Sequence, residues 1–185
     1  MISDVIKDTE KRMTQAVAFT KEDLATIRTG RANPAMFNKL NANYYGAPTP
    51  LQQLATFTSQ DARTIIITPF DPGATREIEK AIRDSDLGVN PTNDGNSIRV
   101  TVPQLTEERR KEYVKQAKGK GEDAKITLRN LRRQGVDTLK KLEKDKEISE
   151  DDLRGAEKQM DSVTKKFVEQ VDELIKAKES ELMEV

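Results

Sequence analysis

The sequence lacks several residue types on which catalytic and metal-binding proteins depend. Its 185 residues include no cysteine, no histidine and no tryptophan. Without cysteine the chain has neither disulfides nor thiolate chemistry, which is typical of a cytoplasmic protein. Without histidine it lacks the commonest general base and the commonest metal ligand. We therefore expect no catalytic site, no metal site and no cofactor.

Aromatic side chains and long apolar stretches are also scarce. Aromatic residues make up 4% of the chain, and no run of 18 apolar residues occurs. A membrane span and a large single core are therefore not expected. The N-terminal segment MISDVIKDTEKRM is too charged for a secretory signal peptide and too acidic for an organellar transit peptide. The composition favours a cytoplasmic protein with a thin, elongated core.

Charge is abundant, and its distribution is uneven. Lys+Arg and Asp+Glu both number 32, so the net charge is zero. Residues 106–148 hold 14 basic and 9 acidic side chains, whereas residues 149–185 hold 6 and 11. A basic segment followed by an acidic one predicts two paired helices with a basic face left over.

Residues 106–146 predict one uninterrupted helix, which at ~1.5 Å per residue would be ~60 Å long. Thr106 is the expected N-cap, with Glu107 and Glu108 at the positive end of the helix. Gly121 and Gly135 occupy heptad positions, where they either admit a close partner helix or weaken this one. The heptad positions are Val114, Gly121, Leu128, Gly135 and Leu142, interleaved with Ala117, Ala124, Leu131 and Thr138.

Two further segments show the same 3.5-residue spacing. Residues 3–29 predict a helix with Ser3 as its N-cap, and residues 149–183 predict one with Ser149 as its N-cap. Ile6, Met13, Thr20 and Ile27 recur every seven residues in the first of these, and Leu153, Met160 and Phe167 do so in the second. Three such helices predict an antiparallel three-helix bundle.

The segment between the first and second helices has a different character. All 7 prolines and 5 of the 9 glycines lie within residues 30–105. Short β-type runs predict strands, a loop over 91–96 predicts a hairpin, and Ile78 and Ile82 indicate a short helix over 74–84. We predict an α+β protein in which a small β/α/β domain, residues 30–105, is inserted into a bundle of residues 1–29 and 106–185. The expected strands cover 40–44, 54–58, 64–68, 87–90 and 98–102.

Basic side chains follow one side of the long helix beside its apolar positions. This basic stripe spans about a quarter to a third of the circumference. An ordinary solvated surface is an equally good explanation, because surface helices are rich in lysine. Arg129, Arg132 and Arg133 favour contact with an RNA backbone, since a guanidinium can bind two phosphate oxygens. The stripe consists of Lys111, Lys115, Lys118, Lys125, Arg129, Arg132, Arg133 and Lys140.

A second basic cluster lies where the chain passes between the two predicted domains. Arg28 and Arg31 flank Gly30, and Arg109 and Arg110 begin the long helix. Pairing with neighbouring glutamates is the structural alternative, although exposed pairs contribute only ~0–1 kcal/mol each. The glycines of KGKGE at 118–122 lack phosphate-loop spacing.

Motifs along the whole chain resemble the bacterial ribosome recycling factor family. The match departs from the family at Lys118–Gly121 and at Gly135, and it is weaker over 56–76. The motifs are IRTGRA (27–32), YYGAPTPLQQLA (44–55), EKAI (79–82), SDLGVNP (85–91), IRV (98–100), LTEERRKE (105–112), RNLRR (129–133), DKEISEDD (145–152) and KESELM (178–183).

The resemblance implies an L-shaped, monomeric, cytoplasmic factor that is not an enzyme. It implies that the bundle binds large-subunit ribosomal RNA after peptide release, overlapping the transfer RNA site. Elongation factor G, with GTP, would then split the ribosome, and initiation factor three would keep the subunits apart. The RNA-contacting arginines of the family fall on Arg132, with Arg129 and Arg133 beside it, and on Arg28, Arg31 and Arg110. A two-strand hinge is expected at Thr29, Gly30, Pro103 and Leu105.

Two other classes of protein share some of these features. A coiled-coil adaptor or chaperone would also have heptads and heptad glycines, and would bind only proteins. An enzyme with an RNA-binding helical arm would need a ligand pocket within residues 30–105. Sedimentation with ribosomes at several salt concentrations separates these classes from a ribosome-binding factor.

Overall fold

The computed structural model describes residues 1–184, which form two compact units. One unit joins Met1–Leu24 to Lys115–Glu179 and consists of helices. The other joins Ala25–Val114 to the residues from Ser180 on, and it contains all the strands of the described chain. No helix within residues 1–184 is long and apolar enough to cross a bilayer. The domain boundaries expected at residues 29/30 and 105/106 stay a prediction.

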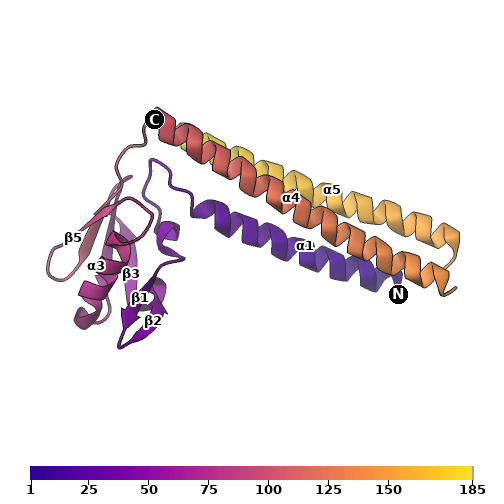
Figure 1. Ribbon diagram of the computed structural model, residues 1–185, viewed down its shortest axis with the longest axis horizontal. Coiled ribbons are helices and arrows are strands. Elements are labelled where there is room, and N and C mark those ends of the chain that lie inside the picture. The colour runs from indigo at the N-terminus through magenta and orange to yellow at the C-terminus, as the bar shows by residue number, and fades with distance from the viewer. Residues whose placement is uncertain (185) are drawn as a thin grey trace. The chain divides into compact units, whose positions relative to one another are not determined.

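Three long helices lie side by side in the helical unit (Figure 1). They are α1 (Ile2–Ala25), α4 (Glu107–Lys144) and α5 (Glu150–Met183). The 38 residues of α4 correspond to about 57 Å, so the prediction of one uninterrupted helix is confirmed. The start of α1 packs where α4 ends and α5 begins, since Ile2, Leu142 and Leu153 border one cluster. The fold is therefore the predicted α+β arrangement of an antiparallel three-helix bundle and a small inserted sheet domain.

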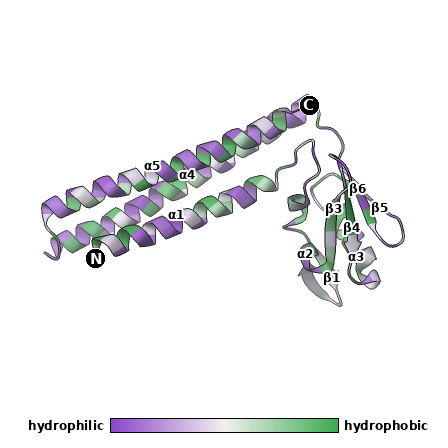
Figure 2. Ribbon diagram, turned by 180° about the vertical axis from the view of Figure 1, so that it is seen from behind, coloured by the Kyte–Doolittle hydropathy of each residue, from purple (hydrophilic) through white to green (hydrophobic). Residues whose placement is uncertain are grey.

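The bundle core follows the predicted heptad positions except near the end of α4, where the predicted Thr138 is exposed and its neighbour Leu139 is buried instead. Met13, Leu128 and Phe167 bring one residue from each helix into one cluster, and Leu139 and Met160 centre a second. In Figure 2 apolar residues recur along all three helices between polar ones. Burial of one narrow stripe per helix explains how so polar a chain forms these apolar clusters.

Both heptad glycines of α4 are sites of close helix packing. A Cβ on Gly121 would lie 1.9 Å from Cδ1 of Ile175, and one on Gly135 would lie 2.7 Å from Oγ1 of Thr9. Gly119, two residues away, has open space where a Cβ would be. The choice that the sequence left open is thus decided in favour of close approach at Gly121 and Gly135.

Two of the three predicted N-cap residues are confirmed by the structure. Oγ1 of Thr106 accepts a hydrogen bond from the amide of Arg109 at 3.2 Å. Oγ of Ser149 accepts one from the amide of Asp152 at 3.0 Å, and Oδ2 of Asp152 accepts the return bond from Ser149 at 3.2 Å. The prediction for Ser3 is wrong, because α1 begins at Ile2. The predicted end at residue 29 is also too late, since α1 stops at Ala25 and the heptad residue Ile27 is buried in the loop that follows.

A four-stranded antiparallel sheet and a separate hairpin form the rest of the second unit. The sheet has the order β3-β4-β6-β5, and α3 (Thr75–Arg83) contacts its edge strand β5 and the hairpin. Phe37, Ile65 and Ile78 are among its fully buried residues. The strands are β3 (Ala55–Ser59), β4 (Thr64–Pro69), β5 (Asn90–Asn93), β6 (Ile98–Thr101) and, in the hairpin, β1 (Asn41–Tyr44) and β2 (Ala47–Pro50). The same unit also contains the short helices η1 (Pro34–Phe37), α2 (Leu51–Leu54) and η2 (Pro72–Ala74).

Proline accounts for the strand predictions that differ from the structure. The strand expected over 87–90 lies at 90–93, so the hairpin loop is shorter than the predicted 91–96. Pro91 lies on the edge strand β5 and pairs with Val100 of β6. An edge strand tolerates proline because the N–H that proline lacks need not pair with another strand. β2 was not predicted, because Pro48 and Pro50 interrupt its pattern. It forms a two-stranded ladder with β1 in which Tyr44 pairs with Ala47.

Candidate nucleic-acid interface

The basic stripe of α4 divides into a part that faces α5 and a part that faces solvent. Nζ of Lys118 lies 3.7 Å from Glu179, and Nζ of Lys125 lies 2.5 Å from Oδ1 of Asp172. Nη1 of Arg132 lies 3.1 Å from Oδ1 of Asp161. These three ion pairs join the basic helix to the acidic one, as the charge distribution predicted.

Lys125 is the most structural member of the stripe. Its side chain is 16% exposed and contacts both Asp172 and Glu122. The hydrogen bond to Asp172 raises the pKa of Lys125 and outweighs the opposing effect of desolvation. Lys125 is therefore a charged cross-link between helices and has little surface to offer a ligand.

Arg129, Arg133 and Lys115 lie on the solvent side of the same helix. Nη2 of Arg133 donates to the side chain of Asn130 at 3.0 Å. Neither Arg129 nor Lys115 has an ion pair among the described residues. In helical projection Arg129 and Arg133 lie within about 40° of each other, so the two side chains form one cationic surface.

Arg132 lies at the border between the two parts. Its side chain is 41% exposed and is held by Asp161 through one N–H group. A guanidinium carries five N–H donors, so donors remain for a phosphate while Asp161 fixes the orientation of the group. Arg129, Arg132 and Arg133 thus form one surface of three guanidinium groups.

Arg28 contacts backbone carbonyl groups. Its Nη2 donates to the carbonyl of Pro103 at 3.0 Å, and its Nη1 to that of Leu87 at 3.4 Å. Its Nε is buried and has no hydrogen-bond partner among the described residues. The Pro103 contact joins the two chain segments expected to form the hinge, of which Thr29 and Leu105 are buried and Gly30 is half-buried. This geometry gives Arg28 a structural contact, and an RNA contact for it stays a prediction.

Arg31 and Arg110 line one cavity of about 240 Å³. Arg63, Glu181 and Glu184 also line it, and Nε of Arg31 lies 3.4 Å from Oε2 of Glu184. Arg63 was not predicted, because it lies in the segment 56–76, where the resemblance to the family is weaker. Arg109 pairs with Glu112 at 3.6 Å, which is the structural alternative considered for it.

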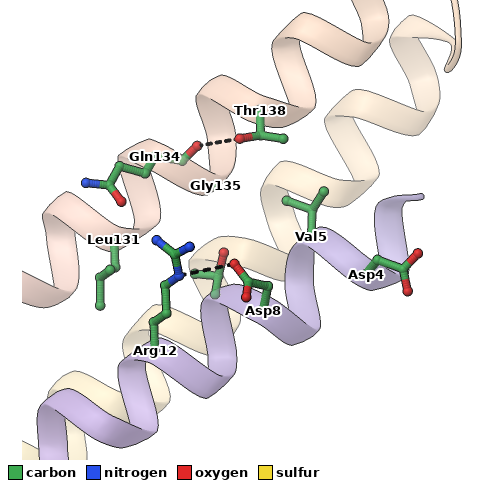
Figure 3. A pocket seen from close by; sticks show the side chains of 9 residues that line it. Asp4, Val5, Asp8, Arg12, Leu131, Gln134, Gly135 and Thr138 are labelled. Carbon is green, nitrogen blue, oxygen red and sulfur yellow. Dashed lines mark hydrogen bonds and ion pairs between the residues drawn. The ribbon is translucent and has the colours of Figure 1, made fainter.

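A larger cavity of about 370 Å³ lies between α1 and α4 (Figure 3). Asp8 and Arg12, one turn apart on α1, pair at 3.2 Å on its α1 side, and Leu131 and Gly135 line its α4 side. In helical projection these two α4 residues lie roughly opposite Arg129. The cavity is therefore separate from the cationic surface. The described residues contain no cluster of side chains suited to a metal ion.

The chain is similar to known proteins along its whole length. A family model described as "Ribosome recycling factor" matches residues 20–183. The chain is 62% identical to the ribosome-recycling factor of Cutibacterium acnes and 60% identical to that of Streptomyces coelicolor, in each case over the full length of both chains.

A solution structure of the ribosome recycling factor superposes with a TM-score of 0.78 at 38% identity, covering 100% of this chain and 98% of that one. A second neighbour has a TM-score of 0.70 at 41% identity and covers both chains fully. It is described as models for the T. thermophilus ribosome recycling factor and the E. coli elongation factor G bound to the E. coli post-termination complex. The chain therefore belongs to the ribosome recycling factor family.

Proposed function

We propose that this protein binds the post-termination ribosome and, together with elongation factor G and GTP, separates it into subunits. The observation that carries the proposal is the exposed arginine surface of α4, in a chain whose structural neighbour was placed on a post-termination complex with elongation factor G. The partner bound by this surface is large-subunit ribosomal RNA, and initiation factor three acts afterwards on the separated subunits. The protein acts as a monomer in the cytoplasm and catalyses no reaction itself.

The charge pattern supports recognition of RNA by its backbone. Guanidinium groups bind phosphates regardless of base sequence, and A-form RNA is recognised largely by shape and backbone. The acids of α5 neutralise Lys118 and Lys125 but leave Arg129 and Arg133 unneutralised. RNA therefore docks along the solvent side of α4, with Arg132 at the edge of the footprint.

The hinge at Thr29, Gly30, Pro103 and Leu105 is a further part of the proposal. Two chain crossings restrict motion to roughly one axis. The hydrogen bond from Arg28 to Pro103 joins the two crossings. A disulfide or proline that locks these segments should leave ribosome binding intact and block subunit splitting, and a locked variant with full recycling activity would show that swing is not needed.

Substitution of Arg132 tests the binding surface. Arg132→Ala should weaken binding to large subunits by about tenfold, which corresponds to one lost charge-assisted contact. Helicity and the melting temperature should stay unchanged, because the Asp161 pair is exposed and contributes little. Sedimentation with ribosomes at near-physiological salt measures the effect, and unchanged binding would rule out the assignment.

A further inference from the structure

The turn between β1 and β2 belongs to the longest uncharged stretch of a highly charged chain. Charged residues make up 35% of the sequence, yet none occurs in the 21 residues from Leu40 to Gln60. These residues form the hairpin, α2 and β3, and many of their side chains are exposed. An exposed surface without charge is unlike the rest of this molecule. Depletion of charge together with exposed tyrosine is characteristic of the central part of protein–protein interfaces.

Tyr45 lies at the end of this hairpin, and its side chain is 85% exposed. Its φ is 50° and that of Gly46 is 82°, which is the left-handed pair required by a two-residue type I′ turn. Asparagine, aspartate or glycine normally occupies the first of these positions, because other side chains are strained there. The geometry of the turn therefore favours another residue at this position and does not explain the presence of Tyr45.

Contacts with Tyr44 and Asp71 hold this ring in place. The two rings meet edge to face with centroids 4.5 Å apart. Oη of Tyr44 donates to Oδ2 of Asp71 at 2.8 Å, and Oη of Tyr45 lies 3.5 Å from the same oxygen. The other oxygen of Asp71 accepts the amide of Gly73 at 2.9 Å. Asp71 is therefore fixed as a carboxylate beside an exposed aromatic ring.

The pKa shifts of these groups favour an ionised Asp71 at neutral pH. The Gly73 amide, followed by the Tyr44 hydroxyl, lowers the pKa of Asp71. The hydrogen bond to Asp71 raises the pKa of Tyr44 to about 12, so the phenol stays protonated. An aromatic ring next to a carboxylate attracts a cationic side chain through the ring face and through charge. The same carboxylate repels the phosphates of RNA, and the uncharged stretch offers no lysine or arginine to bind them.

We infer that the β1–β2 turn docks onto a protein partner that presents a lysine or arginine side chain, which contacts the ring of Tyr45 and the carboxylate of Asp71. This inference rests on the proposed function, in which elongation factor G is the protein partner during subunit splitting. It separates two surfaces of one molecule: α4 binds RNA, and the charge-free hairpin binds protein.

Tyr45→Asn is the variant that distinguishes docking from folding. Asn-Gly is a favoured type I′ turn, so this variant should unfold at the wild-type temperature or above it. It should bind ribosomes alone with an affinity within about twofold of wild type, while the concentration of elongation factor G for half-maximal splitting should rise about tenfold. Tyr45→Phe keeps the ring and should resemble wild type, and Asp71→Asn should move in the same direction as Tyr45→Asn. Phe19→Ala, which removes an aromatic side chain that is 64% exposed on α1, is the matched control and should change nothing.

Purified ribosomes, elongation factor G and GTP are the probes, with light scattering as the measure of splitting. A wild-type requirement for elongation factor G in Tyr45→Asn would overturn the inference. Weakened binding of that variant to ribosomes without elongation factor G would also overturn it, because the turn would then contact the ribosome itself. If the wild-type chain failed to split ribosomes, the proposed function would fall first, and that outcome is distinguishable from loss of the Tyr45 effect alone.

Discussion

On the side of α4 that faces α5, Lys118 and Lys125 each contact a carboxylate, whereas Arg129 on the solvent side contacts none among the described residues, and Arg132 lies between the two. Glycine shows the same contrast, since Gly121 packs against Ile175 while Gly119 has open space beside it. Residues of one type therefore differ in role according to the face on which they lie. The inward face holds the bundle together, and the outward face is the one proposed to bind RNA.

The largest expected effect compares one substitution at two glycines. Gly121→Val should lower the free energy of unfolding by about 3 kcal/mol, because the new side chain overlaps Ile175 in a closely packed contact. Gly119→Val should change it by less than about 0.5 kcal/mol, since valine and glycine differ little in helix propensity and the space is open. Urea unfolding of both variants measures the difference. Equal stabilities would show that the close approach of α4 and α5 at Gly121 is absent.

The second effect compares two cations of the basic stripe. Arg129→Gln should weaken ribosome binding by about tenfold, as expected for the loss of one charge-assisted contact with phosphate. Lys125→Gln should alter binding by less than about twofold and lower the free energy of unfolding by about 1 kcal/mol or less, because it removes an interhelical ion pair. Filter binding and thermal unfolding of both variants distinguish the roles. A larger binding defect in Lys125→Gln than in Arg129→Gln would reverse the assignment of the two faces.

The smallest effect is a dependence of stability on alkaline pH. The pKa of Lys125 is raised in the folded state, mainly by Asp172. A raised lysine pKa gives stabilisation that is complete below the unfolded value, near 10.4, and is lost as the pH rises through the folded value. The wild-type chain should therefore lose slightly more stability than Lys125→Gln between about pH 10 and pH 12. Identical alkaline profiles for the two chains would mean that the Lys125–Asp172 pair contributes nothing.

The helices were largely predictable because their determinants are local. Heptad spacing identified the buried residues Met13, Leu128 and Phe167, and the caps at Thr106 and Ser149 lie where the sequence indicated. The end of α1 was misplaced because Ile27 continues the heptad pattern after the helix has stopped. Burial in a loop and burial in a helix give the same spacing over one or two residues.

The small sheet was less predictable, since its pairing depends on residues distant in sequence. β2 contains two prolines, and the ladder with β1 becomes visible only when the turn at Tyr45 and Gly46 is known. The strand expected over 87–90 lies three residues further along for a similar reason: Pro91 is tolerated because β5 is an edge strand. Position in a sheet is a property of the fold that a single strand does not encode.

The alignment of the basic side chains on α4 was predictable, but the environment of each side chain was not. The stripe on α4 followed from spacing alone, yet its division depends on how the acids of α5 align with it. The contacts of Arg28 with Leu87 and Pro103 join residues that are 59 and 75 positions apart in the chain. Local sequence patterns do not indicate contacts between such distant residues. The RNA-binding roles of all six arginines stay predictions: Arg28, Arg31, Arg110, Arg129, Arg132 and Arg133.

The salt dependence of ribosome affinity tests most directly the claim that the outward face of α4 binds RNA. For contacts with nucleic acid phosphates, the logarithm of affinity falls linearly with the logarithm of salt concentration, by roughly 0.7–0.9 per contact. The combined variant Arg129→Gln/Arg133→Gln should therefore show a slope shallower than wild type by about 1.5, while Lys125→Gln keeps the wild-type slope. An unchanged slope in the combined variant, or an equal change in Lys125→Gln, would contradict the division of α4 into a bundle face and an RNA face.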